Sequence, residues 1–83
     1  MYFVYIIQSE ADESYYIGFT ENLQKRISDH NSGNTNYTSK KMPWILVYFE
    51  SFDNKTVALK REKFLKRQKN KDFYQRLINN QDR

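Results

Sequence analysis

The fold of this chain is decided by residues 15–30, which read YYIGFTENLQKRISDH. The first part is aromatic and β-branched around Gly18, which predicts a strand that ends in a turn. Thr20 is then in position to cap a helix whose inner stripe is Leu23, Ile27 and His30. Arg26 lies four residues before His30, so the two side chains share one helix face.

The residues before this stretch predict its partner strand. Residues 2–9 are apolar on both faces, as in an inner strand, and the polar turn 10–13 joins them to a second strand over 14–20. If Ser9 faces Ser14 across that turn, Tyr5 lies opposite Gly18 and Tyr16 projects to the same sheet face as Tyr5. A slip of one residue would separate the two tyrosines.

The rest of the chain predicts one more strand and two more helices. We expect a surface loop over 34–43, a third strand over 44–52 beside the first, a helix over about 55–69 capped by Asp53 or Asn54, and a terminal helix with Phe73, Leu77 and Ile78 inward. The tail from residue 79 is polar and expected to fray. The prediction is an α+β fold with a three-stranded antiparallel sheet flanked by helices, in the order β-β-α-β-α-α, forming a single domain over residues 1–83.

The charge distribution and the composition limit the classes of function that the chain can have. Residues 55–71 contain eight basic residues and one acid, a net charge of +7, whereas the rest of the chain is net −3. Such a basic stripe indicates either a nucleic-acid partner or a solvated helix face kept charged for solubility. Cysteine is absent, which excludes disulfides and thiolate metal sites. The apolar run 2–7 is too short to cross a membrane, so we expect a soluble cytoplasmic protein with no membrane partner.

Five features in order along the chain resemble the GIY-YIG endonuclease domain, and most closely its small stand-alone branch. They are Tyr16-Ile17-Gly18 as the second motif, Phe3-Val4-Tyr5 as a degenerate first motif, Arg26 eight residues after Gly18 with His30 one turn on, Tyr37-Thr38 followed by Pro43-Trp44, and Ala58-Leu59-Lys60-Arg61-Glu62-Lys63. The resemblance covers nearly the whole chain. Two positions depart from the family: Phe3 replaces its first glycine, and Phe19 stands where the repair members carry lysine.

This resemblance implies one divalent ion, usually Mg²⁺ (or Mn²⁺), held by the single carboxylate of Glu62. Mg²⁺ is commonly bound by one or two carboxylates together with water and substrate oxygens. Arg26 would hold the scissile phosphate through its planar guanidinium. Tyr5 would act as the general base or as a relay to it, and Tyr16 would orient the water or bond a phosphate oxygen. His30 would take the proton of Tyr5 or act as the base itself.

Each of these residues also has a plain structural explanation. Glu62 is placed to form an i, i+4 pair with Lys66, and Arg26 to pair with Asp29 or Asn22. The tyrosines are ordinary residues for packing in a hairpin, and a histidine on a buried helix stripe is often structural. A catalytic function is favoured because the chain retains four residues together that nucleic-acid binding alone does not require: Tyr5, Tyr16, Arg26 and Glu62.

We therefore predict a metal-dependent endonuclease that acts on DNA, with RNA as the alternative, and that is structure-selective or weakly specific. Six basic residues are expected to follow the phosphate backbone: Lys40, Lys41, Lys60, Lys63, Lys66 and Arg67. Two other classes stay open. One is a nucleic-acid-binding module of the same fold without turnover, and the other is a protein-interaction domain whose basic helix meets an acidic partner.

Overall fold

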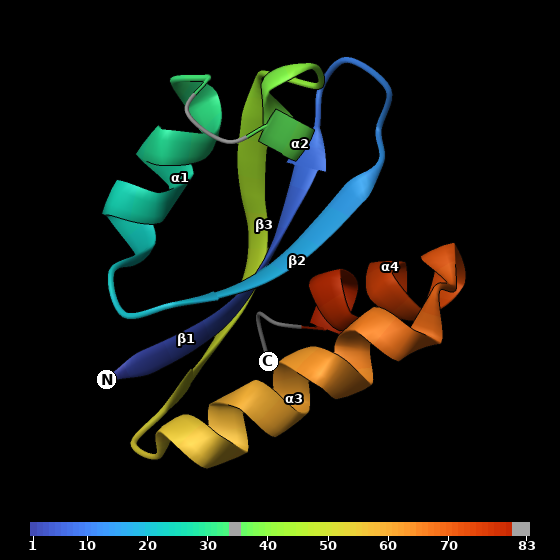
Figure 1. Ribbon diagram of the computed structural model, residues 1–83. Helices are drawn as coiled ribbons and strands as arrows, with labels where there is room; N and C mark the ends of the chain where they lie inside the picture. Colours follow the sequence, from blue (N-terminus) through green and yellow to red (C-terminus); the bar gives the residue numbers. More distant parts are fainter. Residues whose placement is uncertain (34–35, 81–83) are drawn as a thin grey trace.

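The central strand β1 (Tyr2–Ser9) organises the molecule, because both other strands pair with it (Figure 1). The computed structural model describes residues 1–33 and 36–80. In it, β2 (Tyr15–Thr20) and β3 (Trp44–Phe52) lie antiparallel to β1 on either side, in the order β2-β1-β3. The predicted fold class is confirmed.

The register of the hairpin is also as predicted. Tyr5 lies opposite Gly18, and Ile7 lies opposite Tyr16. The amide of Ser9 donates to the carbonyl of Ser14 at 2.9 Å, which closes the turn. Because directly opposed residues project to one face, Tyr5 and Tyr16 lie on the same side of the sheet.

Helices cover both faces of the sheet (Figure 1). α1 (Leu23–Asn31) lies on one face, and α3 (Lys55–Gln68) and α4 (Lys71–Asn80) lie on the other. The prediction that Thr20 caps the first helix is wrong: Asn22 is the N-cap, and its side chain accepts from the amide of Lys25 at 3.1 Å.

The same capping chemistry begins α3 and α4. Asn54, one of the two predicted caps, accepts from the amide of Val57, and Asn70 accepts from the amide of Phe73. The predicted fraying tail lies partly inside α4, which continues to Asn80, and partly outside the described residues.

Alternation along β1 builds two separate clusters of side chains. On the α3 side, Val4 and Ile6 are fully buried against Ala58, Leu65 and their neighbours. On the α1 side lies a second cluster, whose buried members are Tyr5, Ile7 and Trp44. Trp44 is only 3% exposed, so it belongs to the core.

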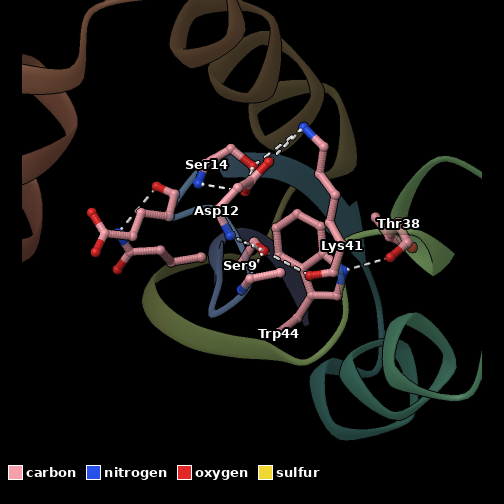
Figure 2. A network of polar contacts seen from close by, with 9 residues as sticks. Ser9, Asp12, Ser14, Thr38, Lys41 and Trp44 are labelled. Carbon is pink, nitrogen blue, oxygen red and sulfur yellow. Dashed lines mark hydrogen bonds and ion pairs between the residues drawn. The ribbon is translucent and has the colours of Figure 1, made fainter.

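The predicted surface loop over 34–43 is only partly irregular. Residues 34 and 35 lie outside the described part of the chain, but α2 (Asn36–Ser39) is a short helical turn inside the segment. Figure 2 shows how this segment is attached to the hairpin: the ammonium of Lys41 lies 3.3 Å from a carboxylate oxygen of Asp12, and the hydroxyl of Ser9 donates to the carbonyl of Lys41 at 2.7 Å. The segment is therefore positioned by side-chain contacts that its polar sequence does not predict.

None of the helices in the described residues is both long and apolar enough to cross a membrane. The cytoplasmic location stays a prediction.

Candidate active site

The ring of Tyr5 lies across Gly18 on the neighbouring strand. A Cβ built on Gly18 would overlap the hydroxyl and the ring of Tyr5. The glycine is therefore needed for close approach of a side chain, and not for a special backbone angle. It lets the phenol of Tyr5 extend over β2, one of the two edge strands of the sheet.

The hydroxyl of Tyr5 starts a chain of buried hydrogen bonds. It lies 2.9 Å from Nε2 of His30, and Nδ1 of His30 lies 2.9 Å from the hydroxyl of Thr38. All three residues are fully buried. Because both ring nitrogens have partners, His30 is held in one orientation, and the tautomer with its proton on Nδ1 leaves Nε2 free to accept from Tyr5.

Burial keeps this pair neutral. Desolvation raises the pKa of Tyr5 to about 12, although the nearby Arg26 guanidinium opposes the shift. The pKa of His30 is lowered, first by burial and then by the positive charge of Arg26. In the free protein at neutral pH the pair is therefore a phenol and a neutral imidazole, and a free phenolate does not form.

Arg26 and Tyr16 complete the cluster on this face. Interaction with the Tyr5 hydroxyl raises the pKa of Arg26, and the half-buried ring of Tyr16 lies 5.1 Å from the ring of His30 between centroids. Asp29, one of the alternative partners expected for Arg26, instead forms its ion pair with Lys25 at 3.3 Å. The structure thus brings Tyr5, Tyr16, Arg26 and His30 together, as the hairpin register and the helix spacing predicted.

Glu62 approaches from the opposite layer. It lies on α3 between the buried Ala58 and Leu65, and its side chain is 17% exposed. Its carboxylate lies 3.1 Å from the ammonium of Lys66, so the i, i+4 pair weighed as an alternative is present. Its charge also helps to raise the pKa of Tyr5, which places it within electrostatic reach of the cluster. The structure therefore places the charge of Glu62 within reach of the Tyr5 hydroxyl, while the carboxylate itself is paired with Lys66.

Glu62 offers the kind of ligand that Mg²⁺ prefers. Among the described residues, no group of three His, Cys, Asp or Glu side chains is placed to hold a metal ion. A hard cation here would have one protein carboxylate, and water and phosphate oxygens would complete its shell. The residue present fits an ion that binds together with the substrate.

The predicted phosphate contacts fall into two groups. Lys60, Lys63 and Arg67 are exposed on α3, and Lys40 is exposed beside α2. Lys41 and Lys66 are instead paired with Asp12 and Glu62, respectively. The exposed basic side chains can bind a polyanion directly. Lys41 and Lys66 can do so only after their ion pairs with Asp12 and Glu62 are broken.

Two positioning residues were missed from the sequence. Thr38 is fully buried on His30, and Asn31 bonds both backbone groups of Trp44, accepting from its amide at 2.6 Å and donating to its carbonyl at 3.0 Å. Both occur in polar stretches that read as solvent-exposed. The Tyr37-Thr38 pair was noticed only as a motif, and no periodicity marks Thr38 as inward.

Comparison with known proteins identifies the family of the chain. Residues 1–77 match the family model described as the GIY-YIG catalytic domain. A UPF0213 protein of Clostridium perfringens is 48% identical over 68 residues, which cover 81% of this chain and 72% of that protein. A UPF0213 protein of Streptococcus pneumoniae is 38% identical over 82 residues, covering 98% of this chain and 82% of that one.

A solved structure shows the same fold. The solution NMR structure of a UPF0213 protein from Bacillus halodurans superimposes with a TM-score of 0.61 at 30% identity, covering 98% of this chain and 86% of that one. The family model spans nearly all of the sequence. The chain therefore belongs to the GIY-YIG family, a family of nucleases.

Proposed function

We propose that this protein hydrolyses phosphodiester bonds in nucleic acid, with DNA as the favoured substrate and one Mg²⁺ or Mn²⁺ ion as cofactor. The observation that carries the proposal is the buried hydrogen bond between Tyr5 and His30 beside Arg26. Packing alone would be served by apolar side chains, because a buried polar pair costs free energy unless it is fully bonded. A phenol, an imidazole and a guanidinium in contact supply the groups that this reaction needs.

Arg26 is assigned to the phosphate. Its guanidinium presents several N–H donors in one plane, which suits two oxygens of one phosphate, and its charge opposes the extra negative charge of the transition state. Because Arg26 is half-buried beside Tyr5, it also places the phosphate near that hydroxyl.

Tyr5 and His30 are assigned to proton transfer from the attacking water. The attacking water gives a proton to the Tyr5 oxygen as the phenol passes its own proton to Nε2 of His30, so no free phenolate is needed. The high pKa of Tyr5 favours such a relay over a direct base. Since Tyr5 is fully buried, water reaches its hydroxyl only after the covering side chains shift. Tyr16, which is half-buried, is assigned to orienting that water.

Glu62 is the residue that would hold the cation. When bound, the ion supplies positive charge to the phosphate oxygens and to the leaving oxygen. Until then the carboxylate is paired with the ammonium of Lys66. The exposed lysines and arginine of α3 are assigned to the flanking backbone phosphates, a contact that gives affinity without sequence information.

A cleavage assay tests this proposal. Branched, flapped and single-stranded DNA and RNA are incubated with Mg²⁺ or Mn²⁺ and the natural chain, Arg26→Ala or Lys25→Ala. We expect a loss of 10³-fold or more for Arg26→Ala, whose charge meets the phosphate, and little change for its exposed neighbour. Cleavage that persists equally in all three proteins would mean a contaminating nuclease and would end the assignment.

A binding module without turnover is the second candidate. The full burial of Tyr5 and the occupation of Glu62 by Lys66 favour it, because both must be undone before reaction. It predicts salt-dependent binding of nucleic acid that Glu62→Ala leaves unchanged, and no cleavage of any substrate in the same assay.

A further inference from the structure

A groove of about 440 Å³ continues from the candidate active site along the outer side of β2. It is lined by four tyrosines and two lysines, together with Ile17: Tyr15, Tyr16, Tyr37, Tyr74, Lys66 and Lys69. Its volume lies in the range of sites for small ligands. Tyr16 lines this groove and also contacts the ring of His30, so the groove adjoins the cluster.

The walls of the groove are aromatic. On one side the rings of Tyr16 and Tyr37 lie 5.8 Å apart between centroids and are tilted by 32°. On the other side the rings of Tyr15 and Tyr74 meet edge to face at 5.6 Å. Tyr37 is 57% exposed, so its ring is accessible to a partner.

The exposed ring of Tyr37 is held in place from below. The next residue, Thr38, is fully buried, and its carbonyl accepts from Nε1 of Trp44 at 2.9 Å. The ammonium of Lys41 lies 5.3 Å from the ring centroid of Tyr37. A rigid aromatic face loses little conformational entropy when a flat ligand stacks on it.

The lysines give the groove a positive edge. Lys69 ends α3 in a left-handed conformation, with φ of 46°, and its amide donates to the hydroxyl of Tyr74 at 3.2 Å. Within the described ranges, no acid forms an ion pair with its ammonium. Lys66 lies in the same groove and reaches Glu62, so it connects this edge to the proposed cation site.

Aromatic rings beside ammonium groups are the chemistry that binds single-stranded nucleic acid. We propose that this groove binds one unpaired nucleotide next to the scissile phosphate, with its base stacked on Tyr37 and its phosphate on Lys69. A paired base has both faces covered by its neighbours, so the groove selects substrates with an unpaired nucleotide at the cleavage point. This inference rests on the proposed function, since it names the substrate of the same site.

Binding without catalysis tests it. A short fluorescein-labelled oligothymidylate is titrated in EDTA with the natural chain, Tyr37→Ala, Tyr37→Phe and Tyr37→Trp, each checked for folding by circular dichroism. Loss of the ring is expected to weaken binding by roughly 5- to 150-fold, whereas Tyr37→Phe keeps the ring and stays near the natural affinity. Tyr37→Trp is expected to bind at least as tightly, a result that misfolding cannot produce.

A matched pair of lysines tests the phosphate. Lys69→Ala is expected to lower the affinity and to reduce the slope of log affinity against log salt by about 0.7, the value for one contact to a single strand. Lys55→Ala removes the same charge from the far end of α3 and is expected to change both quantities less. Equal effects of the two substitutions would show that only net charge matters, and would overturn the phosphate assignment.

A base-specific control separates stacking from charge. An oligonucleotide with one abasic position is expected to bind the natural chain more weakly, and to lose little more affinity with Tyr37→Ala. If Tyr37→Ala binds the intact strand as the natural chain does, or if polyglutamate displaces the strand at equal charge, the nucleotide site is refuted. These titrations contain no metal and measure binding alone. They therefore test the nucleotide site even if the protein cleaves no substrate.

Discussion

The two faces of the sheet use the same central strand for different purposes. Val4 and Ile6 of β1 point to the side of α3 and α4, where the buried cluster is apolar apart from the tyrosine hydroxyl of Tyr74. Tyr5, between them in sequence, points to the side of α1, where His30 and Thr38 are also fully buried.

The difference teaches that alternation along β1 directs apolar side chains to one face and the buried polar residues around Tyr5 to the other. One face supplies apolar burial, at roughly 25 cal/mol per Å². The other face buries polar side chains, which is tolerated because each of them has a hydrogen-bond partner. Among the described residues, no buried side-chain donor or acceptor lacks such a partner. Substitutions on the two faces should therefore fail in different ways.

Tyr5→Phe should show the largest effect, and it should appear in activity. It removes the hydroxyl that relays the proton, so we expect cleavage to fall by about 10²- to 10⁴-fold, as for loss of a general base. The measurement is single-turnover cleavage of the best substrate from the assay above. A variant that cleaves within threefold of the natural rate would leave Tyr5 with a packing role alone.

Leu65→Ala should instead lower stability and leave activity largely unchanged. This side chain is fully buried on the α3 face, so its truncation is expected to lower the free energy of unfolding by about 2–5 kcal/mol. Urea unfolding followed by circular dichroism gives that value. Below the unfolding transition, cleavage per folded molecule should stay close to natural, and a hundredfold drop there would contradict the separation of the two faces.

Gly18→Ala should lower the stability of the fold at the point where Tyr5 packs over β2. The new methyl group would overlap the ring of Tyr5, and such overpacking costs about 1–3 kcal/mol. Repeating the substitution in a Tyr5→Ala background gives the control, because the clash is then absent and the two changes should be strongly non-additive. Additive losses of stability would show that Tyr5 does not lie over this glycine in solution.

The pH dependence of stability should show the smallest effect. The pKa of His30 is lowered in the folded chain, so the unfolded chain binds the proton more readily. The stability from neutral His30 is then present above its ordinary pKa of about 6.5 and is lost as pH falls toward the folded value, with a slope of at most about 1.4 kcal/mol per pH unit. The difference in unfolding free energy between the natural chain and His30→Gln should be constant near pH 7.5 and should shrink as pH falls below about 6.5 toward pH 5. Parallel curves would mean that His30 titrates normally.

Much of the fold follows from local patterns in the sequence. The parity of the turn between Ser9 and Ser14 sets which residues share a face, so it was enough to place Tyr5 with Tyr16. Helix spacing was enough to place Arg26 with His30. These are short-range regularities, and they determine four residues of the candidate site.

Contacts across long stretches of chain could not be predicted in the same way. Nothing local distinguishes Thr38 from its exposed neighbours, because its burial depends on where His30 and Trp44 lie. The bidentate contact of Arg61 with Glu50, at 2.9 and 2.8 Å, likewise joins α3 to β3 through residues eleven positions apart. Thr20 and Asn22 are both favourable N-cap residue types, so the sequence alone does not determine at which of them the helix begins.

The central claim is that Glu62 and the cluster around Tyr5 form one site across the two layers. The most direct test is the single-turnover cleavage rate in Mn²⁺ of the natural chain, Glu62→Gln and Glu21→Gln, the last being an exposed glutamate that loses the same charge. We predict a rate at least 10²-fold lower for Glu62→Gln, because the cation loses its protein ligand, and a rate within twofold of natural for Glu21→Gln. Cleavage by Glu62→Gln at the natural rate would contradict the account.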